Sequence, residues 1–206
     1  MNVKLIAITP DAEKTMIYIA RVSSDNQDNP DYSGLLKYCL DHHHWSVFEH
    51  AHATVEIETS RAIAAQILRH RSFCFQEFSQ RYSEPDGFEL YHARRQAEKN
   101  RQSSVDDLPE NVAFWWHSEQ LVTWDICMHT YEEAVNKFGI ARECARMILP
   151  LNTTTRLYMT GNIRSWIHYI QLRTARDTQL EHREIALAIR DLLKPELPVI
   201  SEAMGW

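Results

Sequence analysis

Glycine is scarce in this chain, which has 5 glycines among 206 residues. None of them belongs to a G-x-G-x-x-G motif or to a phosphate-binding P-loop. The usual glycine-rich cradle for a dinucleotide or a triphosphate is therefore excluded. If the protein binds a nucleotide, arginine side chains and helix ends have to hold its phosphates.

Closely spaced cysteines, a basic net charge and long apolar runs are missing too. The net charge of −6 argues against a general nucleic-acid-binding protein. No apolar run approaches the length of a membrane-spanning helix, and the N-terminal stretch turns polar too early for a signal peptide. We therefore expect a cytoplasmic protein with no membrane and no nucleic-acid partner. The cysteines lack C-x-x-C spacing, which predicts free thiols: Cys39, Cys74, Cys127 and Cys144.

Charged and polar residues cluster between Gln66 and Tyr82. The apolar spacing from residue 60 to residue 68 predicts a helix, because apolar side chains recur four positions apart. That helix would bring three polar side chains to one face: Gln66, Arg69 and His70. An extended run over residues 73–82 would turn three further side chains to one side of a strand: Glu77, Ser79 and Arg81. The segment therefore predicts a small polar site suited to phosphate or carboxylate oxygens.

A purely structural interpretation of the same segment stays open. Basic residues often end helices, where they meet free carbonyl groups. Glu77 is then a salt-bridge partner for Arg69 or Arg81.

Alternating and helical patterns predict the remaining elements. We expect strands over residues 3–8, 51–59 and 153–160, and helices over residues 10–22, 32–42, 112–137, 140–148 and 177–193. Asn162 is predicted to cap one more helix. The polar composition of residues 84–111, with its prolines and glycine, predicts a loop with a short ordered piece around residues 88–94. The aromatic residues of the 112–137 helix are expected in the core.

Histidines crowd the stretch from His42 to His52, which also holds Glu49. A metal site is one interpretation, although the H-E-x-x-H zinc motif is absent. The other is a polar turn that leads into a strand, with His50 and His52 on one face of that strand.

The segment Arg69-His70-Arg71, followed by Ser79 and Arg81, resembles the signature of the flavin-dependent thymidylate synthases. Further elements match the family in the same order along the chain, between Ala20 and Glu181. They are Ala20-Arg21-Val22-Ser23, then His44 and Ser46 before Phe48-Glu49-His50, then Arg142 to Asn152, Asn162 with Arg164, Leu172-Arg173, and Gln179 with Glu181.

The resemblance implies an enzyme that converts dUMP to dTMP. The family takes a methylene group from 5,10-methylenetetrahydrofolate and a hydride from NADPH, which passes through FAD. The resemblance also implies the family's fold, an α+β single domain over residues 1–206 with a central, mostly antiparallel sheet and packed helices. It further implies a homotetramer whose sites lie between subunits.

The resemblance also implies roles for individual residues. Arg173 would sit on the pyrimidine as the catalytic residue, and His44 would lie near the folate. The dUMP-binding residues would be Gln66, Arg69, Glu77, Ser79, Gln80, Arg81, Arg146 and Arg173. The FAD-binding residues would be Ser46, Arg69, His70, Arg71, Glu77, Asn162, Arg164 and His168. No resident metal is implied.

Several positions depart from the family pattern. Gln80 stands where glycine is common, and a glycine there lets the backbone approach a phosphate. His168 replaces an asparagine and Asp177 replaces a histidine. Cys74 and Gln76 stand where a small hydroxyl residue and an asparagine are common.

Two alternative functions remain open at this point. One is a metal-dependent phosphohydrolase that uses the His42 to His52 cluster. The other is a non-catalytic nucleotide-binding or RNA-binding protein that uses the arginines alone.

Overall fold

The computed structural model describes all residues from 1 to 206. The chain divides into two compact units. The first unit comprises Met1, Glu58–Ile67 and Glu77–Leu157, and the second comprises Asn2–Ile57, Leu68–Gln76 and Tyr158–Trp206. One domain over residues 1–206 stays a prediction.

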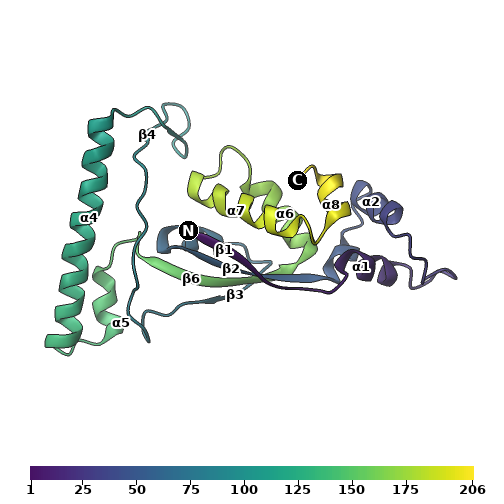
Figure 1. The fold of residues 1–206 in the computed structure, drawn as a ribbon, viewed down its shortest axis with the longest axis horizontal. Coiled ribbons are helices and arrows are strands. Elements are labelled where there is room, and N and C mark those ends of the chain that lie inside the picture. Colours follow the sequence, from purple (N-terminus) through teal and green to yellow (C-terminus); the bar gives the residue numbers. More distant parts are fainter. The chain divides into compact units, whose positions relative to one another are not determined.

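A four-stranded antiparallel sheet has the strand order β1-β2-β6-β3. Side chains alternate along β2, where Ala53, Val55 and Ile57 are buried and the side chains between them are more exposed. The sheet and the helices around it confirm the predicted α+β class (Figure 1). Its strands are β1 (Asn2–Ile8), β2 (His52–Ser60), β3 (Cys74–Glu77) and β6 (Thr154–Asn162).

The second unit holds most of the packed helices. Helix α7 packs against β1 and α6, and α2 packs against α8. Helix α6 is amphipathic: Trp166, Ile167 and Ile170 are buried, while His168 and Gln171 stay exposed. The helices are α1 (Ala12–Ala20), α2 (Ser33–Asp41), the 3-10 helix η1 (Trp45–Glu49), α6 (Ile163–Arg173), α7 (Leu180–Leu193) and α8 (Pro198–Met204).

The first unit is built around one long helix, α4 (Glu110–Glu132). A π-helical turn, η2 (Glu133–Lys137), continues it, and Gly139 follows with a φ of 66°, a left-handed conformation that suits glycine. The other elements are α3 (Arg61–Ile67), the antiparallel pair β4 (Arg95–Gln96) and β5 (Ser104–Val105), α5 (Arg142–Ala145) and the 3-10 helix η3 (Arg146–Ile148).

The expectation that the aromatic residues of α4 lie in the core is confirmed for Tyr131, which is 1% exposed, and is wrong for the aromatic residues near the start of the helix. Phe114 is 72% exposed, Trp115 is 57% exposed and Ile126 is 62% exposed. Apolar periodicity marks a helix face that has to be covered, but it does not say whether the same chain covers it. This face of α4 is therefore an exposed apolar surface in the single chain.

The polar segment departs from the sequence prediction at both ends. Helix α3 ends at Ile67, so Arg69 and His70 lie in the turn that follows it rather than on its face. Strand β3 ends at Glu77, and the amide of Tyr82 donates to the carbonyl of Ser79, closing a turn. The period-two alternation predicted up to residue 82 is therefore wrong beyond Glu77.

Two further expectations, on His50 and on the start of the last long helix, need correction. His50 follows the 3-10 helix η1 and is not on a strand, so it shares no strand face with His52. Residues 88–94 do hold the ordered piece predicted for that loop, since Phe88 forms a bridge with Thr153 and the amide of Tyr91 donates to Gln120, and the β4–β5 pair is a second one. Helix α7 begins at Leu180, not near Asp177, and Pro198 starts the short helix α8. No helix of the chain combines the length and the apolar character needed to cross a membrane.

Candidate functional site

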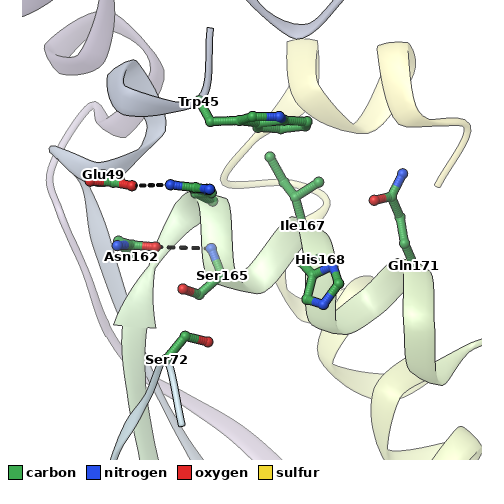
Figure 2. Close-up of a pocket in the computed structure, with 9 residues that line it drawn as sticks. Trp45, Glu49, Ser72, Asn162, Ser165, Ile167, His168 and Gln171 are labelled. Atoms are coloured by element: carbon green, nitrogen blue, oxygen red, sulfur yellow. Dashed lines mark hydrogen bonds and ion pairs between the residues drawn. The ribbon is translucent and has the colours of Figure 1, made fainter. Parts of the chain in front are cut away.

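A cavity of about 670 Å³ lies between η1 and α6 in the second unit. Figure 2 shows Trp45 and Ile167 on one side of it, with Ser72 and the N-terminal turn of α6 on another. The lining mixes aromatic, amide, hydroxyl and cationic side chains: Trp45, Glu49, Ser72, Asn162, Arg164, Ser165, Ile167, His168 and Gln171.

The junction between β6 and α6 fixes one end of this cavity. Asn162 is the N-cap, and its side-chain oxygen accepts a hydrogen bond of 2.9 Å from the amide of Ser165, as the sequence predicted. The helix dipole makes this end electropositive, while the amides of Ile163 and Ser165 are already bonded to Ala51 and Asn162. Arg164 adds a guanidinium there and forms an ion pair with Glu49 of η1.

Several residues of the cavity were not predicted, among them Trp45 and Gln171. Trp45 stacks on His43 with ring centres 5.6 Å apart and packs against the buried Phe48 at 5.8 Å. Gln171 lies on the same exposed face of α6 as Arg164 and His168, because positions three and four apart align. Helical spacing from His168 was therefore a usable signal for Gln171, whereas nothing in the sequence distinguished Trp45.

Arg173 and His70 are brought together at the C-terminal end of α6. The Nε of Arg173 donates a hydrogen bond of 2.9 Å to Nε2 of His70. Burial, together with the charges of Arg173 and His168, lowers the pKa of His70 from 6.5 to about 4. His70 is therefore a neutral acceptor at neutral pH, and the Nη groups of Arg173 remain available to another partner.

Two buried side chains next to His70, those of Tyr169 and His182, contact each other. The Tyr169 hydroxyl and Nε2 of His182 lie 3.1 Å apart. Burial, with the charges of Arg173 and His70, lowers the pKa of His182 from 6.5 to about 3. Burial also raises the pKa of the Tyr169 phenol.

In the first unit, Glu77 has a partner that the sequence interpretation did not name. Its Oε1 accepts from Arg61 at 3.0 Å and from the Thr155 hydroxyl at 2.9 Å. The suggested partners, Arg69 and Arg81, were wrong, because Arg81 instead pairs with Glu143 at 2.9 Å. Glu77 is thus held in place by α3 and β6.

Two predicted nucleotide-binding residues of the first unit carry buried donors without partners. They are Nε2 of Gln80 and Nε of Arg146. Gln80 is only 6% exposed, although it occupies a turn. Buried donors usually find acceptors, so each of these groups suits an acceptor supplied by a ligand.

The remaining predicted residues fall into distinct places. Asn162, Arg164 and His168 line the cavity of the second unit, whereas His44 and Ser46 belong to η1 and its cap without lining the cavity. Arg69 and Arg71 are exposed in the turn after α3 and have no carboxylate partner. Gln66 and Ser79 are half-buried in the first unit.

The histidine-rich stretch does not gather into a metal centre. No group of three or more His, Cys, Asp or Glu side chains in the chain is arranged to hold a metal ion. His42 instead stacks on Tyr38 at 3.9 Å, and its Nδ1 lies 3.0 Å from the carbonyl of the same tyrosine. The four cysteines are free thiols.

Comparisons with known proteins cover nearly the whole chain. The family model described as thymidylate synthase complementing protein matches residues 4–199. The chain is 55% identical over 194 residues to a flavin-dependent thymidylate synthase of Synechocystis sp., covering 94% of this chain and 90% of that protein. It is 50% identical to a probable flavin-dependent thymidylate synthase of Paramecium bursaria Chlorella virus 1, covering 100% of both chains.

Solved structures give a matching fold. The UMP/dUMP methylase PolB from Streptomyces cacaoi, bound with 5-Br dUMP, has a TM-score of 0.87 at 25% identity and covers 99% of this chain and 94% of its own. The same methylase bound with 5-Br UMP has a TM-score of 0.85 at 26% identity.

Proposed function

The chain belongs to the family of flavin-dependent thymidylate synthases, and from that premise we propose that it methylates dUMP to dTMP. The methylene group comes from 5,10-methylenetetrahydrofolate, and NADPH supplies the reducing hydride by way of FAD. The observation that supports the proposal most directly is the environment of the Arg173 side chain. Its guanidinium is half-buried, is held at Nε by a neutral histidine and has no carboxylate partner.

Arg173 is the proposed catalytic residue. A fixed cation beside the pyrimidine stabilises negative charge that develops at N3 and O4 as C5 becomes nucleophilic. Because its Nε is already occupied by His70, the two Nη groups face a ligand in a restricted orientation. Cys39 is a poor nucleophile in the same reaction, since burial raises the pKa of its thiol.

Eight residues are proposed to bind the nucleotide. The buried donors of Gln80 and Arg146 support this assignment, because uracil and phosphate are rich in acceptors. Whether a ribose 2′-hydroxyl is tolerated is open to test, since the methylase PolB binds analogues of both dUMP and UMP. The set is Gln66, Arg69, Glu77, Ser79, Gln80, Arg81, Arg146 and Arg173.

The residues present fit a flavin dinucleotide. The cavity of the second unit combines the N-terminus of α6 and Arg164, which suit phosphates, with Trp45 and Ile167, which suit a ring. When bound, the flavin supplies the hydride that reduces the transferred one-carbon unit. His44 is proposed to lie near the folate. The proposed FAD-binding residues are Ser46, Arg69, His70, Arg71, Glu77, Asn162, Arg164 and His168.

We also propose that the chain assembles as a homotetramer with sites between subunits. The exposed apolar side chains of α4 support this, because Phe114, Trp115 and Ile126 are costly to leave in water. Ile126→Glu is expected to shift the assembly to a smaller species in light scattering. His117→Gln, on the side of the same helix opposite Ile126, is the control. A flavin-loaded monomer of the unaltered protein contradicts the tetramer.

The proposal is tested first by the absorbance spectrum of the purified protein. We expect a flavin spectrum, and dTMP formation that requires dUMP, methylenetetrahydrofolate and NADPH together. Reactions with UMP in place of dUMP measure selectivity for the sugar. A colourless protein that binds nucleotide without turnover would favour the non-catalytic alternative. Stoichiometric zinc or manganese with phosphate release would favour a phosphohydrolase.

A further inference from the structure

Tyr169 and His182 form a buried polar pair to which the proposed function gives no role. Both side chains are fully buried, and neither lines the cavity of the second unit. A buried tyrosine and a buried histidine each cost free energy unless their polar atoms are satisfied. Their contact, at 3.1 Å between the hydroxyl and Nε2, joins α6 to α7.

The direction of this hydrogen bond follows from the protonation states. Burial raises the pKa of the Tyr169 phenol and lowers the pKa of His182, so both groups are neutral near pH 7. The Tyr169 hydroxyl has no other hydrogen-bond partner, so its proton is satisfied only if it donates to Nε2 of His182. His182 then carries its own proton on Nδ1.

Tyr169 is also the surface against which His70 rests. The two rings meet edge to face, with centres 4.9 Å apart and planes at 78°. Phe73 and Trp166 hold the other sides of Tyr169, with ring centres 6.0 Å and 5.9 Å away. His70 in turn accepts the Nε–H of Arg173.

These contacts form a continuous path from His182 to Arg173. We propose that Tyr169 and His182 are positioning residues, whose hydrogen bond holds the ring of His70 and thereby fixes the guanidinium of Arg173 against the pyrimidine. This inference rests on the proposed role of Arg173. The charged or titratable groups that act on His70 are Arg173 and His168, and those that act on His182 are Arg173 and His70.

Three substitutions separate the hydrogen bond from general packing. Tyr169→Phe keeps the ring against His70 and removes only the hydroxyl. His182→Leu removes the acceptor, while His182→Gln keeps one, because the Gln side-chain oxygen reaches about as far as Nε2. Ser201→Ala is the control, since it deletes another buried hydroxyl of the second unit, which donates to the carbonyl of Lys194.

Turnover at saturating dUMP is the first readout. Tyr169→Phe and His182→Leu are expected to lower it about tenfold with the flavin load retained, as for small displacements of a catalytic group. His182→Gln is expected to stay within about twofold of the unaltered enzyme. If His182→Gln loses as much as His182→Leu, or if Ser201→Ala loses as much as Tyr169→Phe, the hydrogen bond is not what positions Arg173.

A double-mutant cycle tests whether the pair acts through Arg173. In the Arg173→Lys background, Tyr169→Phe is expected to change turnover by less than about twofold, because the path to the guanidinium is already broken. Independent, multiplying losses overturn the proposal.

Nitrogen NMR of the histidine rings tests the same path without any turnover. His70 of the unaltered protein is expected as a single neutral tautomer, protonated on Nδ1 because Nε2 accepts from Arg173. Tyr169→Phe is expected to move its ring nitrogens towards values averaged over both tautomers. Unchanged signals in Tyr169→Phe contradict the inference. An inactive protein with these signals as expected contradicts only the proposed function.

Discussion

Arginine is held in two different ways in the two units. In the first unit the arginines pair with carboxylates: Arg61 with Glu77 at 3.0 Å, Arg81 with Glu143 at 2.9 Å, Arg95 with Asp107 at 2.6 Å, Arg142 with Glu84 at 3.0 Å and Arg156 with Glu58 at 2.8 Å. In the second unit Arg69, Arg71 and Arg173 have no carboxylate partner.

The difference identifies where positive charge is available to a ligand. A guanidinium beside a carboxylate is largely neutralised, and its hydrogen-bond donors are engaged. Arg173 is instead bonded to a neutral histidine, which fixes its orientation without cancelling its charge. Each unit also has exceptions: Arg164 pairs with Glu49 and Arg190 with Asp191 in the second unit, and Arg146 in the first unit leaves its Nε without a partner.

The strongest test of this contrast is Arg173→Lys. A lysine keeps the charge but loses the planar fork and the Nε contact with His70. If Arg173 stabilises charge on the ring, turnover at saturating dUMP falls about 10²–10³-fold, with a smaller effect on dUMP affinity. NADPH-driven flavin reduction stays measurable. Arg190→Lys is the control, because Arg190 pairs with the neighbouring Asp191. Near-normal turnover would return Arg173 to simple anchoring.

Acid titration tests whether the histidines around Arg173 are neutral. Their folded pKa values, about 4 for His70 and about 3 for His182, lie below 6.5, so only the unfolded chain takes up these protons as the pH falls below 6.5. Stability is full above pH 6.5 and declines below it, by about 1.4 kcal/mol per pH unit for the fully buried His182 and by less for half-buried His70.

Urea unfolding between pH 7 and pH 4 measures this slope. His182→Gln removes one of the two titrating groups, so its stability is expected to fall less steeply with acid than that of the unaltered protein. Equal slopes for the two proteins contradict a neutral His182.

Local patterns predicted the elements that carry the site. Short-range residue spacing, which can be read from the sequence alone, predicted the N-cap at Asn162, the strand β6 and the helix face with Arg164 and His168. The family pattern named Arg173 and His70 separately, but neither spacing nor pattern said that they touch. Their contact joins residues 103 positions apart and depends on the turn after α3.

Partner choice was the least predictable feature. Glu77 had several arginines within reach in sequence, and the fold selected Arg61 because α3 and β3 come together. The pair Tyr169–His182 links two helices, so it has no periodic signature. The exposed face of α4 shows the same limit, since one sequence pattern serves both a core and an interface.

Arg71→Ala tests the exposed arginines of the turn after α3. Because Arg71 has no carboxylate partner, its removal costs the fold little. If it binds a flavin phosphate, flavin affinity is expected to fall about tenfold, measured by flavin retention on dilution. Arg176→Ala, at another exposed position of the second unit, is the control. A full flavin load in Arg71→Ala rules out this contact.

The smallest expected effect is also the most direct test of the carboxylate-paired arginines. Arg81 is proposed to bind dUMP, yet Glu143 occupies its Nε at 3.1 Å and its Nη2 at 2.9 Å. Glu143→Gln weakens that competitor, and since both side chains are exposed, the free energy of unfolding changes by less than about 1 kcal/mol. Arg81 is then freer to meet an anion, so dUMP affinity is expected to rise about twofold, as measured by calorimetry at low salt. Glu84→Gln, which weakens the pair with Arg142 instead, should leave the affinity unchanged. A lower dUMP affinity in Glu143→Gln would mean that the carboxylate orients Arg81 for the nucleotide rather than competing with it.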